Sequence, residues 1–140
     1  MKPRLISILF FVLLLSQTAC DPDFYETSCD NCFQDKPTVG LLTVAVLYNG
    51  TDSIPIKIFK GRSIEKGELY ITDTIGSDIA EFWVDVGSHY SVEAEYFIGG
   101  RTYNVVDSDK VAVFLDESNC DEVCWRPNDG HVDCKITQEP

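Results

Sequence analysis

The sequence predicts an all-β fold, a β-sandwich of about seven short antiparallel strands that follows an N-terminal export segment. Two observations predict it. Apolar and polar residues alternate in short segments, and turn residues separate these segments at spacings of about 8–15 residues. The part of the chain after residue 20 also shows no segment with a convincing helical period. Strands with this alternation bury one face and expose the other to water, which favours two sheets packed through their apolar faces.

The expected strands begin at residue 41. The first is β-branched and apolar and ends at the turn pair Asn49-Gly50. Glycine turns bound most of the others, and Pro55 suits a strand start or an edge. The expected strands are 41–48, 54–60, 69–72, 79–86, 90–96, 101–106 with its continuation 110–115, and 132–137.

The first 19 residues have the layout of a secretory signal peptide. Lys2 and Arg4 form a basic start, residues 5–15 are an apolar run, and small polar residues follow. The run is shorter than the roughly 20 apolar residues that a membrane span needs. We therefore expect residues 1–19 to be removed, residues 20–37 to form a tether, and residues 38–140 to form the β-sandwich domain.

The end of this leader, Thr18-Ala19-Cys20, resembles the lipobox of bacterial lipoproteins in a relaxed form, because Gln17 takes the usual apolar position. The resemblance implies that Cys20 becomes the mature N-terminus and carries a diacyl group on its sulfur. Each buried CH₂ group contributes about 0.8 kcal/mol, so two chains anchor a protein stably. An ordinary signal peptide with a structural Cys20 is the alternative.

The residues after Cys20 are strongly acidic. Losing the leader takes the formal net charge from −12 to −14, because Lys2 and Arg4 leave with it. Such a surface repels phosphate, so we expect no nucleic-acid partner. The tract 21–26 resembles the export signal of surface lipoproteins in one group of Gram-negative bacteria, whereas enterobacterial sorting would retain it at the inner membrane. We expect a lipid-anchored protein on the outer-membrane surface, with a periplasmic face as the alternative.

Residues 41–115 resemble prealbumin-like modules, and immunoglobulin-like sandwiches share much of the pattern. The resemblance rests on three segments, 54–61, 82–87 and 90–96, in which a strand, a strand ending at a glycine turn and a Tyr-Ser-Val strand follow one another. The whole chain resembles small bacterial surface lipoproteins with paired cysteine clusters. That resemblance implies the fold and no activity.

Five cysteines besides Cys20 form two clusters at either end of the strands. In an exported protein the default state is disulfide, and five thiols leave one unpaired. We expect the first cluster to pair with the 120/124 pair of the second, with Cys134 free or exchanging. The cysteines are Cys29, Cys32, Cys120, Cys124 and Cys134.

Two alternatives use the same thiols. The Cys29-x₂-Cys32 and Cys120-x₃-Cys124 pairs, with His131 and Cys134, could hold tetrahedral zinc. The first pair also has the spacing of thiol oxidoreductases, but the acidic residues around it should raise a thiol pKa rather than lower it.

No catalytic residue and no cofactor is predicted, because phosphate loops, nucleophile elbows and zinc-protease motifs are absent from the sequence. Trp83 and Phe97 fall on the polar faces of expected neighbouring strands, beside acidic residues. They are candidates for a platform that binds sugar rings or a protein, and the alternative is that they cover a loop or the cysteine clasp. Trp125 is expected to pack on the cysteine cluster.

Two polar features have simpler interpretations. His89 is expected in a solvated turn. The carboxylates of Asp107-Ser108-Asp109 and Asp121-Glu122 are expected to be loop charges, with a shared Ca²⁺ at Asp107 and Asp109 as an alternative.

Overall fold

The protein is a two-layered β-sandwich, as the sequence predicts. The computed structural model describes residues 33–116 and 123–137, which form a three-stranded and a five-stranded sheet. The predicted leader 1–19, Cys20 and three further cysteines, Cys29, Cys32 and Cys120, lie outside the described residues. None of the described residues belongs to a helix long and apolar enough to cross a bilayer.

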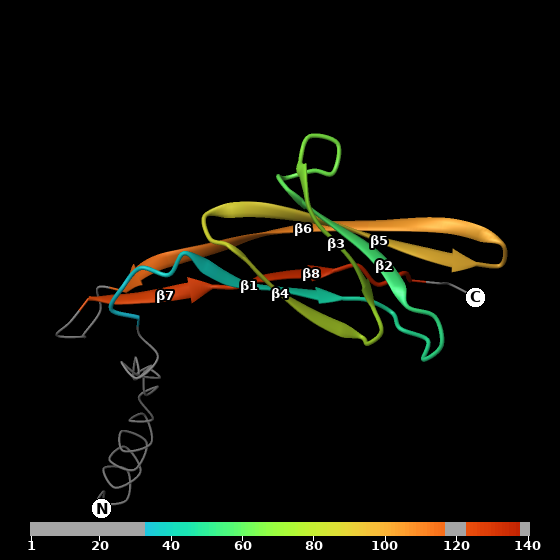
Figure 1. The fold of residues 1–140 in the computed structure, drawn as a ribbon, viewed down its shortest axis with the longest axis horizontal. Coiled ribbons are helices and arrows are strands. Elements are labelled where there is room, and N and C mark those ends of the chain that lie inside the picture. Colours follow the sequence, from blue (N-terminus) through green and yellow to red (C-terminus); the bar gives the residue numbers. More distant parts are fainter. Residues whose placement is uncertain (1–32, 117–122, 138–140) are drawn as a thin grey trace, which may run out of the picture.

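Eight strands make up the two sheets (Figure 1). The small sheet has the order β4-β1-β8 and the large sheet the order β3-β2-β5-β6-β7. Neighbouring strands are antiparallel except for β1 and β8, which pair in parallel. The strands are β1 (Val39–Ala45), β2 (Ile54–Lys60), β3 (Glu68–Ile75), β4 (Ile79–Asp85), β5 (Ser88–Ile98), β6 (Arg101–Asp116), β7 (Cys124–Asn128) and β8 (Gly130–Asp133).

The core lies between the sheets and follows the alternation of the sequence. In β2, the isoleucines at 54, 56 and 58 are buried, while the residues between them are exposed. In β4, Val84 is fully buried and Trp83 is 70% exposed. Tyr96 connects the layers, because its hydroxyl donates to the Cys134 carbonyl at 2.7 Å and accepts from the Leu47 amide at 3.0 Å.

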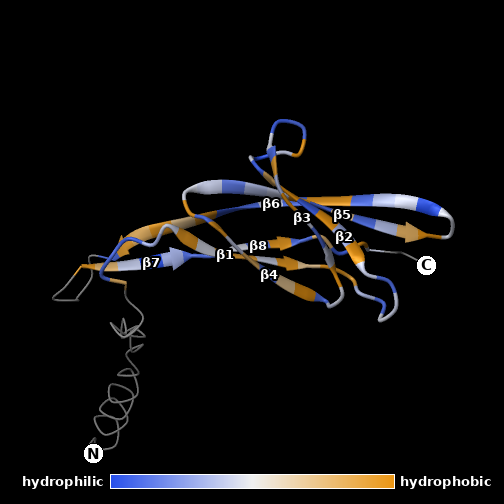
Figure 2. Cartoon of the chain, viewed as in Figure 1, coloured by the Kyte–Doolittle hydropathy of each residue, from blue (hydrophilic) through white to orange (hydrophobic). Residues whose placement is uncertain are grey.

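Strand β6 runs along almost the whole molecule (Figure 1). Its first part pairs with β5, and its last five residues, 112–116, pair with β7. Figure 2 shows this last part as the more hydrophobic end of the strand. The expected loop at Asp107-Ser108-Asp109 is therefore wrong, since these residues continue the strand in register with β5. His89 also lies in a strand, half-buried opposite Lys110.

Carboxylates join the edge of β6 to the edge of β8. Asp109 accepts the Lys110 amide with Oδ1 at 2.7 Å and the His131 amide with Oδ2 at 2.8 Å. Asp107 does the same with the amides of Ser108 and Asp133, both at 2.8 Å. Ionised carboxylates only accept hydrogen bonds, so they can satisfy two edges that both present donors. These aspartates are structural links between the sheets and not free loop charges.

The chain changes sheets between β7 and β8, at Asp129. The side chain of Asp129 accepts the Leu41 amide at 3.0 Å, and β8 then enters beside β1. Gly130 opens this strand at a point where the two sheets lie close together. A Cβ atom there would lie 2.9 Å from both Leu42 and Val111, one from each sheet. A side chain at residue 130 would therefore push the two layers apart.

We expect Asp109→Asn to lower the free energy of unfolding by about 1 kcal/mol, because the amide N–H₂ of Asn would face one of the two backbone N–H groups that the carboxylate accepts. Urea denaturation followed by circular dichroism measures the change. Asp73→Asn is the matched control, since Asp73 accepts the next amide at 2.8 Å but contacts no other strand. Equal losses in the two variants would contradict the cross-sheet role of Asp109.

Candidate binding groove and the cysteine sites

Trp83 stands on the outer face of the small sheet, as its place in the alternation predicts. Its side chain is 70% exposed, which is high for tryptophan, the largest of the twenty side chains. It pairs across the ladder with Leu41 of β1. Exposed aromatic groups on a rigid strand are typical of recognition surfaces rather than of folding cores.

Trp83 lines a groove of about 420 Å³. The opposite wall comes from the segment that leads into β1, which carries Phe33 and Pro37. Phe33 is itself half-exposed. Most of the lining is apolar, while two carboxylates and one ammonium group supply polar contacts. The lining residues are Phe33, Asp35, Lys36, Pro37, Thr38, Val39, Gly40, Trp83, Pro127 and Asp129.

The segment before β1 is held against β7. Phe33 and Trp125 exchange two backbone hydrogen bonds, of 3.1 and 2.8 Å. The Lys36 ammonium lies 5.2 Å from the centre of the Trp125 ring, a cation–π contact. This wall of the groove is therefore fixed to the long β6–β7 pair by backbone and side chain together.

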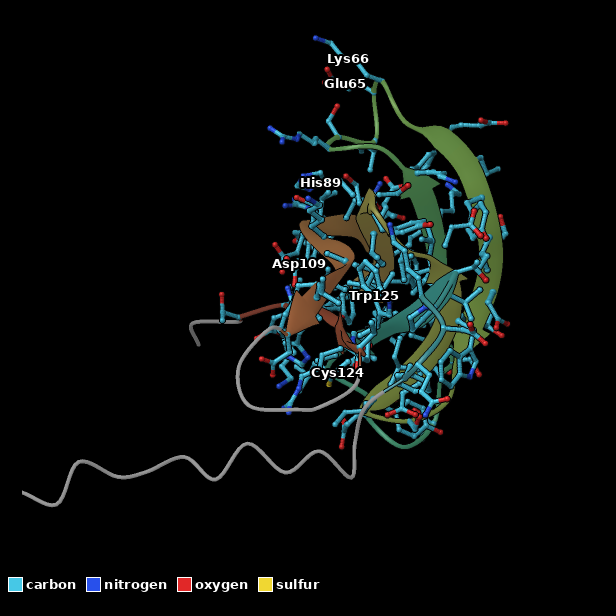
Figure 3. All side chains as sticks on the ribbon, turned by 90° about the vertical axis from the view of Figure 1, so that its left-hand side faces the viewer. Glu65, Lys66, His89, Asp109, Cys124 and Trp125 are labelled. Atoms are coloured by element: carbon cyan, nitrogen blue, oxygen red, sulfur yellow. The ribbon has the colours of Figure 1, made fainter. Side chains whose placement is uncertain are left out.

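The Trp125 ring contacts Lys36, and its packing on the cysteine cluster stays a prediction, because Cys29, Cys32 and Cys120 lie outside the described residues. Trp125 and Cys124 are consecutive in β7, so their side chains point to opposite faces of the strand. Figure 3 labels both on this part of the molecule. Cys124 is fully buried, whereas the Trp125 ring lies under Lys36.

Phe97 is as exposed as predicted but does not share a platform with Trp83. Its side chain is 75% exposed, yet it belongs to β5 of the large sheet, while Trp83 belongs to β4 of the small one. The two strands follow one another in the chain without pairing, because the turn at Gly87 carries the chain from one layer to the other. Phe97 instead lines a separate hollow of about 550 Å³ beside Leu47, Pro55 and Ile136.

The two described cysteines differ in state. Cys124 is disulfide-bonded, and its sulfur partner falls outside the described residues. Cys134 is a free thiol with no exposed surface. Its sulfur lies 3.6 Å from the Val92 carbonyl. Burial raises the pKa of the Cys134 thiol from 9.0 to about 11, so the thiol stays protonated and unreactive at neutral pH.

Metal ligands do not gather in the part of the chain that the structure describes. No group of three or more His, Cys, Asp or Glu side chains in 33–116 and 123–137 could hold a metal ion. His131 lies in β8, and its backbone amide donates to Asp109 Oδ2 at 2.8 Å. The remaining thiols of the zinc alternative are outside these ranges, so that alternative keeps the status of a prediction.

A charged and aromatic cluster joins the layers at the end of β4. Lys60 of β2 reaches across to Asp85, with 2.8 Å between Nζ and Oδ2. The hydrogen bond to Asp85 raises the pKa of Lys60. Tyr90, whose pKa is raised by burial, donates its hydroxyl to the Asp85 carbonyl at 2.9 Å. These contacts fix the position of Asp85 two residues from Trp83.

The groove also contains residues that the sequence analysis did not single out, among them Phe33, Pro37 and Pro127. Pro37 and Pro127 lie in segments far apart in sequence. The β1–β4 pairing brings Pro37 to Trp83, and the β6–β7 pairing positions Pro127. An aromatic residue directly after the first cysteine cluster was the available indication for Phe33.

No protein-family model, no curated protein and no solved structure matches this chain.

We expect the free energy of unfolding to fall as the pH rises from 9 to about 11, because the unfolded chain releases the Cys134 proton while the folded chain keeps it. Denaturation at several pH values measures the slope, and Cys134→Ala should flatten it. Below pH 9 the thiol should resist alkylation until the protein is unfolded. An unchanged slope in Cys134→Ala would contradict this account.

Proposed function

We propose that this chain is a bacterial lipoprotein, anchored through Cys20 at the outer-membrane surface, whose β-sandwich is a non-catalytic interaction module. The observation that carries the proposal is the exposed Trp83 in its mostly apolar groove. Pockets of this kind, apolar with a few polar groups, are typical of binding sites. A large exposed aromatic group gives the fold little stability, so its place on a rigid strand favours a role in recognition.

The position of the groove suits an anchored protein. Its wall at Phe33 lies 13 residues after Cys20, and an extended chain of that length spans at most about 45 Å. A tether of this reach keeps the module near the membrane. The acidic net charge of the mature chain keeps it from associating with acidic surfaces.

Disulfides between the two cysteine clusters would fix the tether to the module. The backbone bridge between Phe33 and Trp125 supports this pairing, because Phe33 follows Cys32 in the chain and Trp125 follows Cys124. The disulfide-bonded state of Cys124 and the free state of Cys134 fit a clasp between the first cluster and the 120/124 pair. A bond across about 90 residues would constrain the unfolded chain by roughly 4–5 kcal/mol in the entropy model.

Metabolic labelling with an alkyne analogue of palmitate in a bacterial host tests the anchor. We expect label on the wild type and in the membrane fraction, and neither in Cys20→Ser. Mass spectrometry of the same product, digested without reduction, should show peptides from the first cluster linked to peptides from the 120/124 pair. An unmodified Cys20 in the wild type would contradict the anchor, and an unlinked first cluster would contradict the clasp.

A carbohydrate ligand is the second candidate, because the exposed Trp83 ring lies between the acidic residues Glu81 and Asp85. Sugar rings stack on exposed aromatic faces and donate hydroxyls to carboxylates. Screening the mature domain on an array of neutral glycans tests it. Binding that is lost in Trp83→Ala and kept in the equally exposed Phe97→Ala would support a glycan site. Binding unchanged in Trp83→Ala would exclude it.

A further inference from the structure

Strand β4 has one edge that pairs with β1 and one outer edge. Strand β4 ends the small sheet, and no described strand lies beyond it. The Val46 amide donates to the Asp78 carbonyl at 2.9 Å, and the Val86 amide donates to the Thr38 carbonyl at 3.0 Å. The two pairs continue the β1–β4 register by one residue at each end. The even-numbered residues of β4 therefore hydrogen-bond to β1, and the odd-numbered residues direct their backbone groups to the free edge.

Side-chain hydroxyls cover both ends of that edge. Ser77 Oγ donates to the Ile79 carbonyl at 2.7 Å, and the Tyr90 hydroxyl donates to the Asp85 carbonyl at 2.9 Å. The backbone N–H and C=O groups of Glu81 and Trp83 lie between these caps. No group in residues 33–116 and 123–137 hydrogen-bonds to them at the free edge.

The opposite edge of the same sheet is treated differently. There the outward amides of β8, at His131 and Asp133, are each accepted by a carboxylate of β6. Natural sandwiches cover or charge their edges because an open edge is a template for another strand. The small sheet thus has one satisfied edge and one edge with an open stretch beside the exposed Trp83.

We propose that this open stretch of β4 binds an extended segment of a partner protein, which adds as a further strand to the small sheet. The inference rests on the proposed interaction-module function and names its partner class. Strand addition uses main-chain hydrogen bonds for affinity and alternate side chains for specificity. The free N–H and C=O groups of Glu81 and Trp83 would supply the main-chain hydrogen bonds, and the side chains of these two residues would supply the specificity.

The charges favour a basic segment. Glu81 is exposed and carries no ion pair among the described residues, while the carboxylate of Asp85 is shared with Lys60. A Lys or Arg opposite Glu81 would gain a cross-strand charge pair, and one over Trp83 a cation–π contact. The net charge of −12 would further attract a cationic segment.

The same charges disfavour a second copy of the chain as the occupant. Antiparallel pairing of two β4 edges about Trp83 would set residue 81 of each copy opposite residue 85 of the other, and both are acidic. Like charges directly opposite in a ladder are destabilising. This register of self-association is therefore disfavoured, whereas a cationic strand meets no such repulsion.

The test selects peptides on the folded mature domain from a phage-displayed library of random peptides. We expect enriched sequences that alternate basic and apolar residues. The key variant is Glu81→Pro, which removes an N–H that faces the free edge and leaves the β1 ladder intact. It should weaken binding of a selected synthetic peptide by at least about ten-fold. Glu81→Ala is the control for the backbone effect, because it keeps the N–H and loses only the carboxylate.

A second measurement does not depend on how the variant folds. Methylating every second backbone nitrogen of the peptide should abolish binding when the methylated nitrogens face β4 and should spare binding when they face away from it. Bound peptide should also slow hydrogen exchange at the amides of Glu81 and Trp83. No enrichment, full affinity for folded Glu81→Pro, or a domain that is dimeric through β4 would each overturn the proposal. Lipid anchoring at Cys20 and a glycan bound at Trp83 would stand apart from these outcomes, so the two proposals fail separately.

Discussion

Strand β8 presents backbone amides on both of its edges, and both sets must be satisfied before the two sheets can close around the core. One edge pairs with β1, and the other faces β6 of the other sheet, with which it forms no ladder. Asp107 and Asp109 solve this by accepting one amide from each strand edge. With β8 in place, the small sheet has its third strand, and the Tyr96 hydroxyl finds the Cys134 carbonyl. The inertness of the Cys134 thiol follows from the same placement, because the closed layers remove it from water.

The local part of the fold was predictable from sequence, because the alternation of side chains is a local property. The strand expected at 54–60 has those bounds, and Trp83 of β4 was assigned correctly to the outward face. The strands that were not predicted from sequence are those that form because of contacts with distant parts of the chain. The charges of Asp107 and Asp109 suggested a loop, and only β8 explains why they lie in a strand. Strand β7, with the sequence CWRPN, has little strand character of its own and forms because β6 offers a partner.

The candidate site divides in the same way. The exposure of Trp83 and Phe97 follows from strand parity, so both were found from sequence. Their separation into two layers does not follow from parity, since a short glycine turn can join either neighbours in one sheet or strands in opposite sheets. Phe33, Pro37 and Pro127 join Trp83 only through contacts between distant segments. The anchor at Cys20 was inferred from a motif, and the fold of residues 33–116 and 123–137 neither needs it nor bears on it.

The 16-residue length of β6 has a mechanical consequence. The chain enters the described fold at Phe33, which bonds to β7, and β7 bonds to the far end of β6. A pull applied at Phe33 would therefore divide between the covalent chain into β1 and, through the two hydrogen bonds to Trp125, the β7–β6–β5 part of the large sheet. Both sheets would then share a load that would otherwise enter through β1 alone.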